Sequence, residues 1–436
     1  MQTETHAGMC HMRTDLVIRS VAIMVCDVVG LLLAVGMVSL QAVAAIEGDR
    51  PSFGPLPQSA RPVGREYIWP EGRMPHFQSH QVAEKTEVVK SKCFNREANR
   101  MPFLEWYEPA ASNKTKTCIL VLSGGGYETC CDAARLQPAI DRFVQSGLTV
   151  ANLTYRTPRP KNLPIYQSSW ADAQRAVRLI RAQAAKRGFS PERIGATGIS
   201  AGAKTVLLLA LSARTPAYER VDALDDCSCR LAFAIPQAPA YVLTDGATGK
   251  NARGGEGADI VPELRFDADT APLCCLQGGI DVYSPLGSVR LCQRLRKLGV
   301  AAELHLFADR WHGFHGDANR GADGTAWDHW CDRMLDFVAL FEPDLVQKRS
   351  KCCSVSLDAV RRVIADAGLP PVLVCGKDEA ELSDALLDEW VVRRRRGVQS
   401  DLHVFARPID DYDRAVCCRE FANHRQLSYP YVECGK

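Results

Sequence analysis

Short apolar runs alternate with longer amphipathic segments through the middle of the chain. Runs typical of buried strands lie at residues 116–124, 148–156, 193–200, 231–241, 270–279 and 302–307. Segments with apolar residues at helical spacing lie at 136–147, 168–189 and 201–213. Strands that alternate with helices of this length form βαβ units, and the parallel sheet they build is covered by helices on both faces. The pattern therefore predicts an α/β protein with a mostly parallel sheet.

Three segments carry further local signals. Residues 168–189 keep their apolar side chains on one helical face, and Gly188 is placed to end that helix. Residues 201–213 are apolar on nearly all sides, which predicts a buried helix. Residues 245–269 are instead glycine-rich, polar and weakly periodic, so we expect a loop or a small cap over the carboxyl edge of the sheet.

The first 45 residues have the pattern of an export signal. Arg13 and Arg19 precede an apolar run at 21–40, and small residues around Ala44 suit signal peptidase. We expect export to the periplasm or the medium, with cleavage near Ala44. The apolar run is long enough that an uncleaved membrane anchor is the alternative.

Composition divides the rest of the chain. Residues 46–65 are rich in proline, glycine and serine, as in a linker, and the α/β pattern predicts a catalytic domain over 66–345. The formal net charge is only +2, which excludes a strong electrostatic footprint for nucleic acid. The partner is therefore expected to be a small molecule or a largely neutral polymer. The basic run Arg393 to Arg396 is interpreted as a solvated helix end.

Eighteen cysteines are many for an exported protein, but they form no recognisable framework. Some disulfides are expected in an oxidising compartment, and the spacing assigns no partners. Cys227 and Cys229 have no second pair at zinc spacing, so neither a metal site nor a cofactor is predicted. Four pairs are adjacent in sequence: Cys130/Cys131, Cys274/Cys275, Cys352/Cys353 and Cys417/Cys418.

The sharpest chemical signal is the GxSxG motif from Gly198 to Gly202, between a predicted strand and a predicted buried helix. In this setting the serine, Ser200, lies on a strained turn that exposes its Oγ, and small neighbours let the backbone turn tightly. The N–H of Ala201 would point into the site from the start of the helix. The context of strand, turn and helix favours a nucleophilic serine over a chance match.

A glycine block, Ser123 to Tyr127, directly follows the predicted strand at 116–124. It is either a simple turn or a loop whose N–H groups, at Gly125 and Gly126, approach a developing oxyanion. A phosphate-binding loop is disfavoured because the block matches neither GxGxxG nor GKS/T.

Such a serine needs an acid and then a histidine, each on a loop after a later strand. Asp281 follows the strand at 270–279, although it could instead cap a helix that begins near Ser284. Two histidines, His312 and His315, follow the strand at 302–307.

Several motifs in this order resemble the exported α/β-hydrolases related to acetylxylan and feruloyl esterases, the BD-FAE type. The resemblance covers roughly residues 66 to 342 and implies an α/β-hydrolase fold and a serine esterase without a cofactor, acting through an acyl-enzyme on a polysaccharide ester such as acetylated xylan. The motifs are WPEGRMP (69–75), SGGGY (123–127), LTYRTP (153–158), DAQRAVRLIR (172–181), RIGATGISAG (193–202), DTAPLCCLQGGID (269–281) and LRKLGVAAELHLFADRWHGF (295–314).

The resemblance also implies the roles of individual residues. Ser200 would be the nucleophile, Asp281 the acid and His312 the base, because Trp311-His312-Gly313 matches the glycine-histidine-glycine of such proteins with one substitution. His315, further along the loop, would be a rim residue. The oxyanion donors would be the backbone N–H groups of Gly125, Gly126 and Ala201.

Three residues depart from the family pattern. Ser123 stands where His or Pro is usual, Lys204 follows the elbow in place of the usual histidine, and Trp311 replaces a glycine beside the base. They change the expected shape of the substrate pocket but remove no member of the triad.

The tail, residues 350–436, resembles part of the hydrolase itself. Shifted by 98 positions, residues 299–309 overlie 397–407 with six identities in eleven. We therefore predict a degenerate copy of the 271–308 region, with His305 matched by His403. It has no GxSxG, and Asp410 stands at the position of His312, so a structural βαβ addition is expected rather than a second active site.

Two other functions share some of these features. An oligopeptidase-like serine hydrolase has the same triad order, but residues 45–110 are far too short for its usual propeller domain. A catalytically inactive, carbohydrate-binding relative is disfavoured by the intact serine, aspartate and histidine.

Overall fold

The computed structural model describes ten stretches of the chain: residues 59–76, 101–111, 114–130, 133–246, 258–279, 281–307, 312, 333–342, 373–375 and 402–404. Contacts divide the chain into two compact units. One unit, Met1–Ser52 with Cys352–Pro370 and Asp410–Asn423, contains none of the described residues. All of the described residues belong to the other unit.

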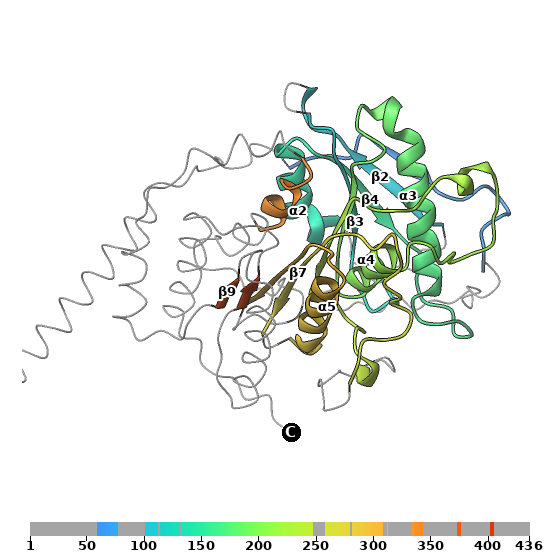
Figure 1. Ribbon diagram of the computed structural model, residues 1–436. Coiled ribbons are helices and arrows are strands. Elements are labelled where there is room, and N and C mark those ends of the chain that lie inside the picture. The colour runs from blue at the N-terminus through green and yellow to red at the C-terminus, as the bar shows by residue number, and fades with distance from the viewer. Residues whose placement is uncertain are drawn as a thin grey trace, which may run out of the picture. The chain divides into compact units, whose positions relative to one another are not determined.

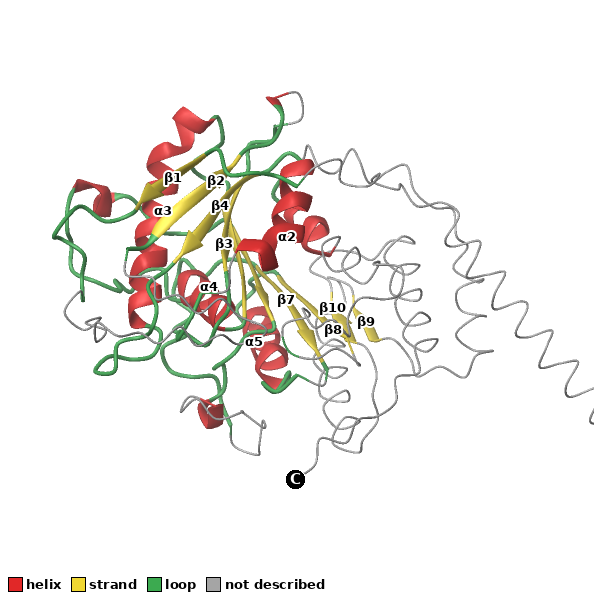
Figure 2. Ribbon diagram, turned by 180° about the vertical axis from the view of Figure 1, so that it is seen from behind, coloured by secondary structure: helices red, strands yellow, loops and turns green. Residues whose placement is uncertain are grey.

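A ten-stranded sheet runs through this unit in the order β1-β2-β4-β3-β5-β6-β7-β8-β10-β9 (Figures 1 and 2). The six central strands, from β4 to β8, are parallel to one another. At one side of them β2 is antiparallel to both β4 and β1, and at the other side β10 is antiparallel to β8 and parallel to β9. This is the mostly parallel sheet of an α/β-hydrolase fold, as predicted. The strands are β1 (Gly64–Tyr67), β2 (Phe103–Tyr107), β3 (Cys118–Leu122), β4 (Thr149–Thr154), β5 (Ile194–Ile199), β6 (Phe233–Gln237), β7 (Leu273–Gly278), β8 (Ala302–Phe307), β9 (Leu373–Cys375) and β10 (Leu402–Val404).

Helices cover both faces of the sheet. One face carries α3 (Gln167–Arg187), α4 (Ala201–Leu211) and α5 (Leu286–Lys297), and the other carries α2 (Ala133–Gln145), as the two opposite views agree (Figures 1 and 2). A helical stretch at 333–338 packs into the same apolar cluster as α2. The doubly covered sheet explains why the central strands read as continuous apolar runs rather than as alternating ones.

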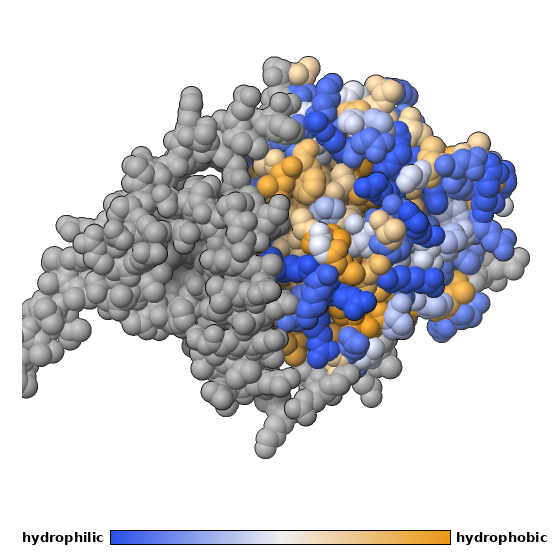
Figure 3. Space-filling model, in the orientation of Figure 1, coloured by the Kyte–Doolittle hydropathy of each residue, from blue (hydrophilic) through white to orange (hydrophobic). Residues whose placement is uncertain are grey.

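The core consists of two main apolar clusters, one on each face of the sheet. In β3, Leu120 and Leu122 join the cluster under α3 and α4, while Ile119 and Val121 join the cluster under α2. This alternation follows from the two-residue period of a strand. Few large apolar side chains are exposed in the described part, and Figure 3 shows polar and apolar side chains interspersed on one face of it.

The local signals for helices are confirmed. Gly188 ends α3 in the left-handed conformation, with φ of +75°, and its N–H reaches the carbonyl oxygens of Ala184 and Ala185. All eleven residues of α4 are buried, as its uniformly apolar sequence predicts.

The antiparallel strands at the amino-terminal edge were not predicted. β1 begins at Gly64, inside the predicted linker. The sequence on either side of β2 contains neither a glycine to mark a turn nor apolar residues at helical spacing. Both are short, and β1 is mostly exposed, so neither leaves the continuous apolar run that identified the central strands.

Strands β9 and β10 come from the predicted repeat. Their register pairs Leu373 with Leu402, and the register of β7 with β8 pairs Cys275 with Leu304, so both partners are shifted by the same 98 residues. Such a match is what a copied strand pair requires. Most of 350–436 lies outside the described residues, and the repeat therefore stays a prediction.

Two predictions concern residues that are wholly or partly outside the described part. The signal or anchor at 1–45 lies outside it, and among the helices that are described, none is both long and apolar enough to cross a membrane. No disulfide joins the cysteines whose side chains the structure describes: Cys118, Cys130, Cys227, Cys229, Cys274, Cys275 and Cys292.

Candidate active site

Ser200 lies on the turn between β5 and α4, at the carboxyl edge of the parallel strands. Its backbone has φ of +57°, which L-residues with a side chain adopt rarely and at a cost. The surroundings hold this conformation: the N–H of Ser200 donates to the Gln237 carbonyl at 3.0 Å, and the Ser200 carbonyl accepts from Lys204 N at 3.1 Å and Ala240 N at 3.3 Å. The serine side chain is thereby raised out of the helix that follows it.

The turn requires glycine where two backbones meet. A Cβ atom on Gly202 would lie 2.4 Å from the carbonyl oxygen of Ser123, far inside van der Waals contact. Because Gly202 has no side chain, α4 can approach the end of β3 and the glycine loop that follows it. This close approach is the physical reason for the last glycine of the GxSxG motif.

The loop after β3 lies directly beside the serine. A Cβ on Gly124 would be 3.0 Å from the Cβ of Ser200, and a Cβ on Gly125, with φ of +130°, would be 2.0 Å from the Thr129 carbonyl oxygen. The Gly125 carbonyl accepts from Glu128 N at 3.1 Å and Thr129 N at 3.2 Å, which folds the loop into a tight turn. The predicted oxyanion loop is thus adjacent to Ser200.

Asp281 follows β7 and its carboxylate is buried. Oδ1 accepts the Tyr283 N–H at 2.8 Å, and Oδ2 accepts the Gln277 amide at 3.4 Å. Gln277 is itself fixed, because its Nε2 donates to the Tyr283 carbonyl at 2.8 Å and its Oε1 accepts the Ser288 hydroxyl at 2.5 Å. Asp281 does not cap α5, whose N-cap is Pro285 without a side-chain cap.

His312 joins the serine to the aspartate. Its Nδ1 lies 2.8 Å from Asp281 Oδ1, and its Nε2 lies 2.8 Å from Ser200 Oγ. Because a carboxylate only accepts, Nδ1–H donates to Asp281, and Nε2 is left to accept the hydroxyl proton of Ser200. The imidazole is 22% exposed whereas the Asp281 side chain is fully buried, so substrate can reach the histidine but not the acid.

The predicted base, His312, is therefore within hydrogen-bond distance of both the predicted nucleophile and the predicted acid. The geometry suits transfer of the Ser200 proton to His312 as the oxygen attacks an electrophilic carbon. Trp311, Gly313 and His315 lie outside the described residues.

Lys204, unusual for the resembled family, lies one turn after Ser200 on α4 with a fully buried side chain. Its Nζ lies 2.8 Å from Glu263 Oε1. Burial lowers the pKa of the amine to about 8, and the Glu263 charge opposes that shift. The pair ties α4 to the segment before β7, and Lys204 contacts the triad through its backbone N–H, which donates to the Ser200 carbonyl.

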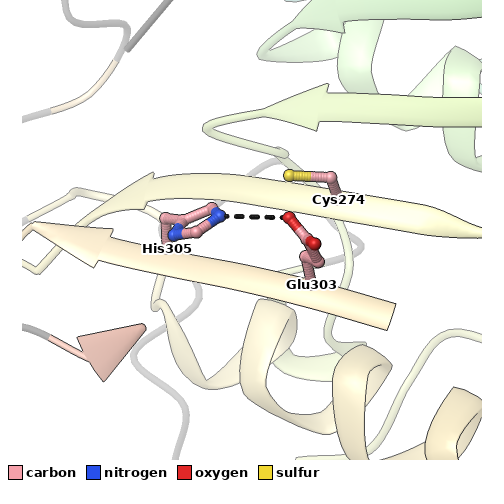
Figure 4. A group of neighbouring side chains, drawn as sticks. All are labelled: Cys274, Glu303 and His305. Atoms are coloured by element: carbon pink, nitrogen blue, oxygen red, sulfur yellow. Dashed lines mark hydrogen bonds and ion pairs between the residues drawn. The ribbon is translucent and has the colours of Figure 1, made fainter. Parts of the chain in front are cut away.

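A cluster of potential metal ligands, which includes no residue of the triad, lies on β7 and β8 (Figure 4). The donor atoms of Cys274, Glu303 and His305 are within 4.8 Å of one another, and all three residues are buried. Burial, reinforced by Glu303, raises the pKa of the Cys274 thiol well above its usual value, and Arg333 only partly opposes this. A protonated thiol is a poor metal ligand, and Arg333 already brings positive charge to the cluster. We interpret the group as a buried polar cluster.

Some residues that shape the site were missed by sequence reasoning. Gln277 and Ser288 orient the acid, yet one lies inside an apolar strand run and the other inside a helix, where neither forms a motif. Tyr241 and Tyr283 lie beside the site and were read only as parts of strand and loop segments. The one signal that could have identified Gln277 is its place as a polar residue inside a strand of otherwise apolar residues.

A pocket of about 330 Å³ also borders the glycine loop, through Glu128 and the segment Pro158 to Ile165. None of the three triad residues lines it. It is therefore separate from the hydrogen-bonded chain described above.

The chain is similar to several known proteins. The BD-FAE family model matches residues 104–243. Endo-1,4-beta-xylanase B of Butyrivibrio fibrisolvens is 26% identical over 210 residues, which cover 46% of this chain and 32% of that protein. The match thus spans about a third of the length of this curated relative.

Among solved structures, esterase 2 of Thermogutta terrifontis phosphonylated by sarin matches with a TM-score of 0.47 and 22% identity, over 59% of this chain and 96% of that chain. Its butyrate-bound structure matches with a TM-score of 0.45 and 23% identity, over 58% and 94%. The order of the strands and the two helical layers establish the fold independently of these matches. Over residues 104–243 the predicted resemblance to the BD-FAE family is confirmed, and the chain has the α/β-hydrolase fold.

Proposed function

We propose that this protein is a serine carboxylic ester hydrolase. The observation that carries the proposal is the hydrogen-bonded chain from Ser200 Oγ through His312 to Asp281, with both links at 2.8 Å. An acid that is buried and a histidine that is partly exposed suit a base that must receive and return protons at the substrate.

In the proposed mechanism Ser200 Oγ attacks the ester carbonyl carbon while His312 Nε2 takes the hydroxyl proton. The carbonyl oxygen becomes an oxyanion and receives hydrogen bonds from the backbone N–H groups of Gly125, Gly126 and Ala201. His312 then returns the proton to the leaving alkoxide, which departs as an alcohol. Water, activated by His312, attacks the acyl-enzyme and releases the carboxylic acid.

Asp281 does not take a proton in this scheme. Its buried carboxylate holds Nδ1–H and stabilises the imidazolium that forms during attack. Gln277 and the Tyr283 N–H in turn hold the carboxylate in the orientation that this task needs.

We infer that the substrate is a polysaccharide ester such as acetylated xylan, and that the protein is exported to meet it. The match to the BD-FAE family, and the relative with xylanase in its name, support a plant polysaccharide as the alcohol. The export pattern of residues 1–45 and the small net charge of the chain agree with an extracellular, largely neutral polymer.

Replacement of Ser200 tests the mechanism. Ser200→Ala should lower hydrolysis of 4-nitrophenyl acetate by several orders of magnitude and abolish labelling by a fluorophosphonate. Ser228→Ala, at an exposed serine whose hydroxyl accepts only from Arg230 N in the described part, is the matched control and should keep both. Full activity of Ser200→Ala would refute the nucleophile, and an unlabelled wild type would favour an inactive carbohydrate-binding relative.

A substrate panel tests the class. Acetylated xylan, a feruloylated sugar and a short peptide anilide should be compared at equal enzyme concentration. Release of acetate from xylan supports the proposal, and cleavage of the anilide alone would favour the oligopeptidase-like alternative.

A further inference from the structure

Three tyrosines form a continuous aromatic wall from the histidine to the glycine loop. The Tyr283 ring centroid lies 5.0 Å from that of His312 and 5.2 Å from that of Tyr241. The Tyr241 ring in turn stacks on Tyr127, with centroids 5.9 Å apart and planes 22° from parallel. These residues come from three different loops, after β3, β6 and β7, so the fold brings the wall together at the carboxyl edge of the sheet.

Of the three tyrosines, Tyr241 has its hydroxyl next to Gly126, one of the predicted oxyanion donors. A Cβ placed on Gly126 would lie 3.6 Å from the Tyr241 hydroxyl oxygen, which is ordinary van der Waals contact. Burial raises the pKa of Tyr283, and the neighbouring Tyr241 hydroxyl adds to this shift. Tyr241 therefore bridges the two ends of the site and is only 9% exposed.

The backbone holds Tyr241 in an unfavourable conformation. Its φ is +57°, and a bulky L-residue rarely adopts such a value. Its loop is clamped on both sides, because Ala240 N donates to the Ser200 carbonyl at 3.3 Å and Val261 N donates to the Val242 carbonyl at 2.9 Å. A strained backbone conformation persists only where the surrounding contacts hold it in place, and such conformations are frequent at ligand-binding sites.

The chemistry of the tetrahedral intermediate limits what this wall can face. The reacting carbon carries the Ser200 oxygen, the oxyanion beside Gly126, the leaving oxygen beside His312 and the acyl substituent. A polymeric alcohol must leave the site toward solvent, which a side chain that is nine-tenths buried does not permit. The acyl substituent is the one group that can be enclosed against such a wall.

We propose that Tyr241 closes the acyl side of the site and sets the longest acyl chain that Ser200 can accept. This inference rests on the proposed function and deepens it, since it names the residue that would restrict the enzyme to short acyl esters. The ring, rather than the hydroxyl, is assigned the restriction, because the ring fills the space between Tyr127 and Tyr283.

The test measures kcat/KM for 4-nitrophenyl acetate, butyrate and octanoate with the full chain, and normalises each rate to the fluorophosphonate-labelled fraction. Tyr241→Ala should raise the ratio of butyrate to acetate by about tenfold or more, the size expected when a clash with one or two methylene groups is removed. Tyr241→Asn removes the ring with a residue that tolerates positive φ, and it should give the same shift if the alanine variant folds poorly.

Two controls isolate the ring. Tyr241→Phe keeps the ring and should keep the wild-type ratio, and so should Tyr67→Ala, at a tyrosine of β1 that is 57% exposed. An unchanged ratio in both ring-deleting variants, or an equal shift in Tyr241→Phe, would overturn the inference while leaving the esterase intact. A wild type that neither hydrolyses any of the three esters nor takes up the label would overturn the proposed function and this inference with it.

Discussion

The strand pairs β7 with β8 and β9 with β10 share a register but not a chemistry. Cys275 pairs with Leu304 in the first, and Leu373 pairs with Leu402 in the second, each 98 residues later. The two pairs meet along β8 and β10, which are antiparallel, with His305 directly opposite His403. On either side of this pair Leu304 lies opposite Val404 and Leu306 lies opposite Leu402, so a local two-fold axis through His305 and His403 relates the two strands.

The difference lies in the loops that follow the strands. After β7 and β8 come Asp281 and His312, which are bonded to each other at 2.8 Å. At the matching sequence positions of the tail stand Glu379 and Asp410, both outside the described residues. Strand register depends on a repeated apolar pattern, whereas catalysis depends on single loop residues. A copy can therefore keep the first and lose the second.

The largest effect should come from the acid of the first pair. Asp281→Asn keeps the size of the side chain but replaces the carboxylate by an amide, which can present either its oxygen or its NH₂ group to Nδ1 of His312. The imidazole is then no longer held in the reactive tautomer, so kcat on 4-nitrophenyl acetate should fall by about ten-thousandfold. Glu379→Gln, the same change at the matching position of the tail, should leave kcat within about twofold, as expected of a group that takes no part in catalysis.

A loss in Glu379→Gln comparable to that in Asp281→Asn would give the tail a catalytic part and break the distinction between the two pairs. The thermal midpoint of both variants shows whether a lost rate reflects chemistry or unfolding.

A smaller loss is expected from Gln277, which orients the acid without touching substrate. Gln277→Leu removes the amide that donates to Asp281 and to the Tyr283 carbonyl, and it strands the Ser288 hydroxyl. We expect kcat to fall by roughly 10- to 100-fold with KM little changed, as for other supporting residues that fix a functional group. Cys375→Ala, at the matching position of β9, should leave kcat unchanged.

Gln277→Glu separates positioning from packing. A second carboxylate beside Asp281 should raise the pH at which activity appears, since like charges favour the protonated acid. A pH–rate profile identical to that of the wild type would mean that Gln277 only fills space.

These residues also show which features of the fold and the site can be predicted from the sequence. The central strands, α3, α4 and Ser200 follow from apolar periodicity and from one motif with its strand and helix, because each is encoded within a short stretch. The choice of Asp281 and His312 depended in addition on the order of the later strands and on the family resemblance. Gln277, Ser288 and the Tyr241 wall depend on contacts between segments that are distant in sequence or hidden within regular elements. The edge strands β1 and β2 were missed for a related reason, since short, partly exposed strands lack a continuous apolar run.

A still smaller effect on activity, though a large one on stability, should come from Leu402. Leu402 is fully buried in the same apolar cluster as Leu304, so Leu402→Ala should lower the free energy of unfolding by about 2–5 kcal/mol, as Leu304→Ala should. Activity of the folded fraction should stay within about twofold for Leu402→Ala. Leu298→Ala, at a residue that is 49% exposed, is the control and should change the unfolding midpoint little.

If the tail were instead a separate satellite, Leu402→Ala would leave the main unfolding transition unchanged. Denaturant unfolding followed by tryptophan fluorescence, in parallel with ester hydrolysis, distinguishes a tail strand that belongs to the hydrolase core from one that does not.

The smallest perturbation, alkylation of native thiols, reports how often each strand pair opens. Burial raises the pKa of Cys274 and Cys275 well above the usual value, so both are protonated at pH 8, and the reactive species is the thiolate. Cys375 lies on β9, the last strand of the sheet, and local opening costs least at an edge. Iodoacetamide followed by peptide mapping should therefore label Cys375 and the half-buried Cys227 well before Cys274 and Cys275. Labelling of Cys274 as fast as Cys375 would mean that the pair of β7 with β8 opens as readily as the pair of β9 with β10, and the two pairs would then differ only in the loop residues that follow them.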